Sequence, residues 1–183
     1  VLLDDLPVTI PGIYTISGGR QIGKTTLLKQ WMLHLLVDKL VVPEAIYFFS
    51  GELIDDHHQL FQYLHDQITR MPNNQMCYLI IDEISYIKDW DKAIKYAADS
   101  GLFENYIVIL TGSDSVLVQE ARMRFPGRRG KSSKTDFHYY PLSFAEVVNL
   151  KGHELTNVTS EVLYQEMDNY LCHGGFLTAI NEF

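Results

Sequence analysis

Hydrophobic residues recur along the chain with two alternating spacings. Short, nearly continuous apolar runs are typical of strands buried on both faces, and apolar residues spaced by three or four positions are typical of amphipathic helices. The apolar runs predict strands at residues 13–16, 45–49, 78–81, 106–110 and 136–140. The three-to-four spacing predicts helices at residues 24–37, 58–70 and 88–100, and helical structure at 160–181 that is broken at 174–175.

Alternation of strands with helices indicates βαβ units, which place parallel strands in one sheet and helices on its faces. The sequence therefore predicts an α/β fold, a three-layer sandwich in which helices cover both faces of a mostly parallel five-stranded sheet. Residues 1–150 are predicted to form one domain. Because the chain of 183 residues stops with no closing element, we expect residues 151–183 to begin a helical region of a longer protein.

A glycine-rich loop follows the first predicted strand and leads into the first long helix. It contains the pattern G-x-x-x-x-G-K-T. Glycines allow backbone N–H groups to approach phosphates closely, and the start of the next helix adds positive charge. The pattern in this context predicts a P-loop. Its nucleotide-binding residues are Gly18, Gly19, Arg20, Gln21, Ile22, Gly23, Lys24, Thr25 and Thr26.

Two acidic residues end the third predicted strand. In an open parallel sheet, ligands lie at the carboxyl ends of the strands, so Asp82 and Glu83 are expected to face the same crevice as the P-loop. Lys24 is predicted to reach the β- and γ-phosphates, the Thr25 hydroxyl to ligate Mg²⁺, and Asp82 to hold the Mg²⁺ through its water shell. Glu83 is predicted to take a proton from the attacking water. No Asn-Lys-x-Asp element is present, which favours ATP over a guanine nucleotide.

Composition and charge limit the classes of partner. The net charge of −8 argues against a surface that binds nucleic acid all over. No apolar run is long enough to cross a bilayer and the first residues lack a secretion signal, so we expect a cytoplasmic protein with no membrane partner. Six of the fifteen lysines and arginines nevertheless lie between Arg122 and Lys134. This cluster fits either a catalytic arginine with solvated neighbours or a loop that binds a partner, including nucleic acid phosphates.

A further strand after the acidic one indicates the order of the sheet. One strand–helix unit separates the P-loop strand from the acidic strand, and residues 106–110 follow it. This arrangement resembles the additional-strand class of P-loop ATPases. The resemblance implies the strand order 5-1-4-3-2, with strands numbered along the chain. It also implies a polar sensor residue near the γ-phosphate, for which Thr111 and Ser113 are the candidates.

Five segments in this order resemble the AAA+ superfamily of P-loop ATPases of bacteria and archaea, a group that often carries a C-terminal winged-helix or nuclease-like region. They are GGRQIGKTTLLKQ, YLIIDEISYIKDWDKAIKY, VILTGSDS, FPGRRGK and YYPLSFAEVV. The resemblance implies that Arg128 or Arg129 approaches a γ-phosphate, either its own or that of a neighbouring subunit in a homo-oligomer. The second sensor arginine of the group has no counterpart, since Lys151 is the only Lys or Arg after Lys134.

The leading functional hypothesis is Mg²⁺-dependent ATP hydrolysis, an ATPase activity coupled to a conformational change. A nucleotide-state switch with negligible turnover is the main alternative. A small-molecule kinase is a second alternative, although Asp82-Glu83 after an intervening strand–helix unit fits water activation better. The sequence leaves open whether a protein or DNA is the partner.

Overall fold

The structure is a computed structural model that describes residues 2–113, 125, 128–153 and 159–176. It divides into two compact units. One comprises residues 1–18 and 24–139, and the other comprises residues 19–23 and 140–183. The domain boundary expected after residue 150 stays a prediction.

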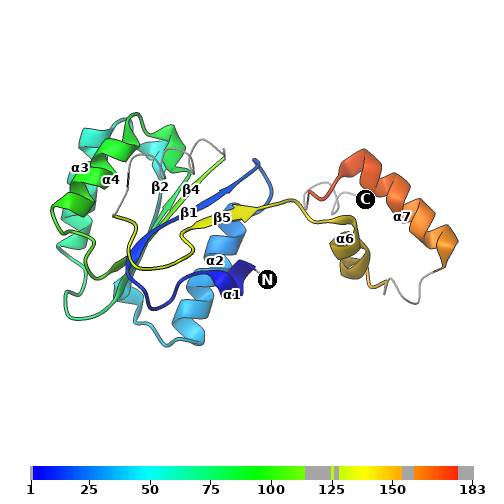
Figure 1. Cartoon of the computed structure of the whole chain (residues 1–183), viewed down its shortest axis with the longest axis horizontal. Coiled ribbons are helices and arrows are strands. Elements are labelled where there is room, and N and C mark those ends of the chain that lie inside the picture. Colours follow the sequence, from blue (N-terminus) through cyan, green and yellow to red (C-terminus); the bar gives the residue numbers. More distant parts are fainter. Residues whose placement is uncertain (1, 114–124, 126–127, 154–158, 177–183) are drawn as a thin grey trace. The chain divides into compact units, whose positions relative to one another are not determined.

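Five parallel strands form the sheet of the first unit (Figure 1). Each strand pairs in parallel with its neighbours, in the order β2-β3-β4-β1-β5. This is the predicted order 5-1-4-3-2 counted from the other edge, so the prediction is confirmed, and the sheet is wholly parallel in its described strands. The strands are β1 (Gly12–Gly18), β2 (Ile46–Ser50), β3 (Cys77–Asp82), β4 (Tyr106–Gly112) and β5 (Asp136–Tyr139).

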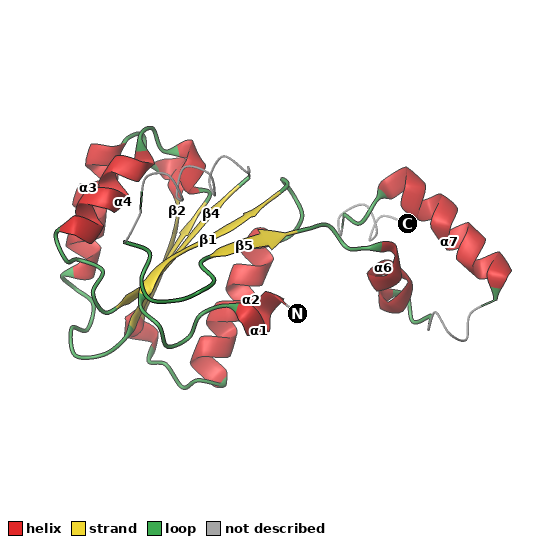
Figure 2. Cartoon of the chain, viewed as in Figure 1, coloured by secondary structure: helices red, strands yellow, loops and turns green. Residues whose placement is uncertain are grey.

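Helices cover both faces of this sheet, which gives the expected three layers (Figure 2). Alternate residues of β3 enter separate cores, because successive strand residues point to opposite faces. Tyr78 and Ile80 pack with α1 and α2, where Trp31 lies edge-on to Tyr78 with ring centroids 5.8 Å apart. Leu79 and Ile81 pack with α3 and α4. These helices are α1 (Leu2–Asp5), α2 (Lys24–Val37), α3 (His57–Ile68) and α4 (Trp90–Asp99).

Three short 3₁₀ helices, which the sequence pattern does not predict, lie in the connections. They are η1 (Pro43–Ala45), η2 (Gly51–Leu53) and η3 (Ile84–Tyr86). The η2 turn packs directly on the turn that follows β3, since a Cβ on Gly51 would lie 2.8 Å from the carbonyl oxygen of Glu83. The loop after β2 is therefore in backbone contact with the predicted catalytic acid.

The second unit contains α6 (Phe144–Leu150) and α7 (Ser160–His173). A capping box starts α6: the Ser143 N–H donates to Glu146 Oε2 over 2.7 Å, and the Glu146 N–H donates to Ser143 Oγ over 3.3 Å. The α7 helix ends at His173, directly before Gly174, where the sequence predicts a break. Among the described helices, none has the length and apolar character that crossing a membrane requires.

Residues 128–131, here called the arginine segment, lie against the start of β1. A Cβ on Gly12 would lie 2.5 Å from the carbonyl oxygen of Arg129. Gly130 has a φ of +84°, and a Cβ there would overlap the carbonyl oxygen of Pro11. Gly12 and Gly130 therefore allow the backbone of the arginine segment to approach the backbone at the start of β1 more closely than a residue with a side chain would permit.

We expect Gly130→Ala to lower the free energy of unfolding by about 3 kcal/mol, from the positive φ and the overlap together. Gly152→Ala is the matched control, because Gly152 has a φ of +81° but no described atom lies within 4 Å of its Cβ position. The control is expected to lose only about 1–2 kcal/mol. Urea denaturation measures both, and equal losses would contradict the close approach.

Candidate functional site

The parallel sheet brings three strand ends to one edge. β1 ends at Gly18 and β3 at Asp82, while Thr111 is the next-to-last residue of β4. β4 lies between the other two strands in the sheet. The α2 helix begins at Lys24, a few residues after Gly18. The fold therefore places the start of α2 beside the acidic end of β3, as expected for an open parallel sheet.

Two residues at the start of α2 contact this edge directly. The Lys24 side chain is buried, and its Nζ lies 3.3 Å from the carbonyl oxygen of Gly18 and 3.4 Å from Glu83 Oε1. The Thr25 hydroxyl donates to Asp82 Oδ2 over 2.6 Å. The two predicted P-loop residues that carry chemistry therefore lie against the two predicted acids.

A buried threonine joins the same two acids from the other side. The Thr111 hydroxyl donates to Asp82 Oδ1, and the backbone N–H of Glu83 donates to Thr111 Oγ1 over 2.9 Å. Each carboxylate oxygen of Asp82 thus accepts a hydrogen bond from one hydroxyl, that of Thr25 in α2 or that of Thr111 in β4. Ser113, the other sensor candidate, follows the end of β4 and is partly exposed.

Glu83 combines an unusual backbone with an unpaired carboxylate oxygen. Its φ of 51° and ψ of 44° are left-handed, which costs a residue with a side chain about 1–2 kcal/mol. Its Oε2 is buried and has no hydrogen-bond partner among the described residues. A buried acceptor that lacks a donor is unfavourable, so this oxygen would gain stability by accepting a hydrogen bond from a donor such as water.

The loop between Gly18 and Lys24 contains two residues with a positive φ. Gly23 has a φ of 97°, which favours glycine, but Gln21 also has a positive φ, of 60°. Gly19, Arg20 and Gln21 are exposed, as is Thr26 in α2, whereas the Ile22 side chain is buried. Their predicted roles at the phosphates stay predictions.

The two candidate arginines lie elsewhere on the first unit. Arg129 NH2 lies 2.5 Å from Asp136 Oδ1 and donates to Thr15 Oγ1 over 3.2 Å, which ties the arginine segment to β5 and β1. Arg128 pairs with Asp99 at the end of α4, and this hydrogen bond holds the pKa of the Asp99 carboxyl below its usual value. These contacts join Arg128 to α4, and Arg129 to β1 and β5.

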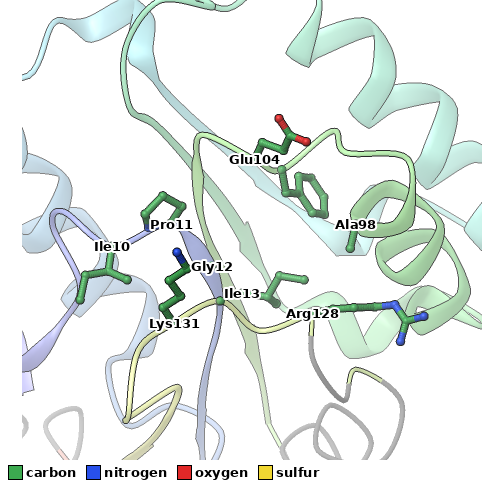
Figure 3. A pocket seen from close by; sticks show the side chains of 10 residues that line it. Ile10, Pro11, Gly12, Ile13, Ala98, Glu104, Arg128 and Lys131 are labelled. Atoms are coloured by element: carbon green, nitrogen blue, oxygen red, sulfur yellow. The ribbon is translucent and has the colours of Figure 1, made fainter.

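Arg128 also borders a pocket of about 450 Å³ at the start of β1 (Figure 3). Ile13 and Phe103 line it on the apolar side, with Lys131 and Glu104 among the polar residues. Residues 114–124 and 126–127, which include Arg122 and two residues of the FPGRRGK segment, lie outside the described residues.

Sequence analysis missed two residues beside this edge. Gly51 packs on the backbone of Glu83, as described above. His138 Nδ1 lies 2.7 Å from the hydroxyl of Ser17, the residue before the P-loop pattern. A glycine directly after a strand is a weak local signal for Gly51, whereas His138 follows only from the register of β5 against β1.

Comparison with known proteins agrees with this architecture. A protein of Haemophilus influenzae, named only as uncharacterised, is 28% identical over 173 residues, which are 92% of this chain and 40% of that protein. One of Methanocaldococcus jannaschii, named in the same way, is 28% identical over 160 residues, 85% of this chain and 32% of that protein. The chain thus spans less than half the length of either relative.

The ORC2 protein of Aeropyrum pernix, solved in its ADP form, has a similar structure with a TM-score of 0.58. The match covers 93% of this chain and 55% of that one. At 13% identity, this similarity concerns the fold alone. The family model described as an AAA domain matches residues 11–148, which include the whole sheet. The chain therefore belongs to the AAA domain family.

Proposed function

We propose that this domain binds ATP with Mg²⁺ and hydrolyses it, and that the reaction is coupled to a conformational change. The observation that carries the proposal is the buried, unpaired Oε2 of Glu83 beside the Lys24 ammonium and the Thr25–Asp82 pair. Membership of a family of nucleotide-binding ATPases supports the same conclusion.

Lys24 supplies the positive charge for the phosphates. Without nucleotide, the Lys24 ammonium pairs with the Glu83 carboxylate at 3.4 Å and donates a hydrogen bond to the carbonyl oxygen of Gly18. A triphosphate is a stronger partner for an ammonium than a single carboxylate. ATP binding is therefore expected to draw Lys24 away from Glu83 and to leave that carboxylate able to accept a proton.

Thr25 and Asp82 are the residues that would hold the metal. A hydroxyl and a carboxylate are the hard oxygen donors that Mg²⁺ prefers, and the two side chains already lie 2.6 Å apart. When bound, Mg²⁺ neutralises the charge that develops on the phosphate oxygens.

Glu83 acts as the base in this proposal. An attacking water transfers one proton to Glu83 Oε2 while its oxygen forms a bond to the γ-phosphorus. The bond between that phosphorus and the β–γ bridging oxygen breaks, which leaves ADP and inorganic phosphate. Lys24 stabilises the negative charge on the phosphate oxygens during this step.

The conformational change follows from what surrounds Glu83. Its carbonyl oxygen packs on Gly51, and the N–H of Lys88 donates to the carbonyl oxygen of Asp55 over 3.1 Å. Release of Lys24 from Glu83 is therefore expected to alter the loop between β2 and α3. This loop carries Leu53, which is exposed and free of the core.

Lys24→Ala is expected to weaken ATP binding on the order of 100-fold, because charged contacts to the phosphates are lost. Lys29→Ala is the matched control, since Lys29 lies in the same helix and is exposed. Isothermal calorimetry measures both affinities, and thermal unfolding checks the fold. Near-normal affinity in folded Lys24→Ala would remove the P-loop assignment.

Glu83→Gln is expected to bind ATP with Mg²⁺ about as well as the natural protein and to hydrolyse it about 100-fold more slowly, the scale of a lost general base. Glu104→Gln, at an exposed glutamate outside this cluster, is the control. Single-turnover hydrolysis distinguishes an ATPase from a switch. If the natural protein binds ATP but its turnover is negligible and unchanged in Glu83→Gln, the domain is a nucleotide-state switch.

Of the two arginines, we propose Arg128 as the one that reaches a neighbouring subunit. Its side chain is 31% exposed against 12% for Arg129, which is held between β1 and β5. Arg128→Ala is expected to slow hydrolysis about 1000-fold with little loss of ATP binding. Arg129→Ala is expected instead to lower stability by about 2–3 kcal/mol.

Mixing Arg128→Ala with Glu83→Gln tests the action between subunits. One composite site would then contain both intact groups, so we expect part of the activity to return and the rate per subunit to rise with protein concentration. A rate independent of concentration, with no recovery on mixing, would show that Arg128 does not act on a neighbour.

A further inference from the structure

Thr111 lies inside the sheet, beside the predicted metal ligand. It is fully buried on β4, and the pairing of Leu110 with Ile81 places it next to Asp82. The resemblance to the additional-strand class of P-loop ATPases makes it one of two candidates for the polar sensor residue near the γ-phosphate. Its hydrogen bonds indicate a different role.

The hydrogen-bonding capacity of its hydroxyl is largely used within the protein. A threonine hydroxyl has one proton to donate and two lone pairs to accept with. The Thr111 proton goes to Asp82 Oδ1, and one lone pair accepts the N–H of Glu83 over 2.9 Å. Phosphate oxygens need a donor, so Thr111 cannot serve a phosphate while it holds Asp82.

The same hydroxyl fixes two groups that the proposed reaction needs. The Asp82 carboxylate is held between the hydroxyls of Thr25 and Thr111, which orients both of its oxygens. The left-handed turn at Glu83 is held on one side by the hydrogen bond from its N–H to Thr111 Oγ1. On the other side, its carbonyl oxygen packs on Gly51. One side chain thus connects the predicted metal ligand to the predicted base.

We propose that Thr111 is a positioning residue that orients Asp82 and Glu83 together and makes no contact with the nucleotide. The inference rests on the proposed roles of those two acids. Loss of the hydroxyl leaves Asp82 Oδ1 with one donor fewer and leaves the Glu83 N–H without its acceptor. The effect appears in the rate of hydrolysis and in the Mg²⁺ dependence, and the preference for ATP over ADP is unaffected.

Thr111→Val removes the hydroxyl at nearly constant shape, and Thr111→Ser retains it. Hydrolysis is expected to fall about tenfold or more in the valine variant, the scale of one lost buried hydrogen bond, and to stay within about threefold in the serine variant. The Mg²⁺ concentration for half-maximal binding of a fluorescent ATP analogue should rise in Thr111→Val alone. The ratio of ATP to ADP affinity should be the same in all three proteins.

Combination with Glu83→Gln separates positioning from direct contact. If Thr111 acts through the two acids, the double variant loses clearly less than the product of the single losses, because the base is already absent. If the loss of hydrolysis in the double variant instead equals the product of the two single losses, and the preference for ATP over ADP is lost, Thr111 contacts the γ-phosphate directly. That result would overturn the proposal.

Tyr78→Phe is the matched control for stability. Tyr78 is buried near the start of β3, and its hydroxyl donates to the carbonyl oxygen of Val8 over 2.8 Å, at the end of the strand opposite Asp82. We expect Tyr78→Phe to lower the unfolding temperature about as much as Thr111→Val and to leave hydrolysis unchanged. Equal losses of hydrolysis in the two variants would mean general destabilisation and would also overturn the proposal.

The two hypotheses fail separately. If the natural protein binds ATP without hydrolysing it, the proposed ATPase activity fails, yet the Mg²⁺ dependence of binding still tests Thr111. An unchanged Mg²⁺ dependence in Thr111→Val would then overturn the positioning role.

Discussion

Parallel pairing of β1 with β4 and of β4 with β3 brings the ends of these strands to one edge of the sheet. Asp82 is the group on which that edge depends, because it accepts hydrogen bonds from a hydroxyl of α2 and a hydroxyl of β4 at once. A carboxyl group that is 4% exposed requires such hydrogen-bond partners. The candidate site is therefore also a structural junction between the sheet and the helix that begins at Lys24.

The junction contains one ion pair, between Lys24 and Glu83, whereas the Asp82 carboxylate is held by two neutral hydroxyls. Lys24 and Asp82 are both buried, and removal of one partner from a buried charged cluster typically costs about 3–5 kcal/mol. Glu83 supplies the neutralising carboxylate for Lys24 but keeps one oxygen unpaired. The exchange of Glu83 for phosphate, which we propose above, rests on the same electrostatics.

The sequence predicts those parts of the molecule that depend on local pattern. Helix α2 has the predicted bounds. The strand order is not a local feature, and its prediction came from the resemblance to the additional-strand class of P-loop ATPases. Thr111 was predicted as a residue of interest, but its hydrogen bonds depend on the register of β4 against β3. The positive φ of Gln21 and the packing of Gly51 on Glu83 depend on distant backbone, which leaves no repeated pattern in the sequence.

The arginine segment shows why a motif alone does not assign a catalytic group. Arg129 bridges β1 and β5 through Thr15 and Asp136, and Gly12 and Gly130 let its backbone lie directly on β1. An arginine held in this way would have to break a largely buried ion pair before reaching any phosphate, which opposes its use as a mobile catalytic group. The exposed pair of Arg128 with Asp99 is easier to exchange, because water can solvate both ions. Of the two adjacent arginines, Arg129 thus anchors the segment to β1 and β5, and the proposed role toward a neighbouring subunit rests on Arg128.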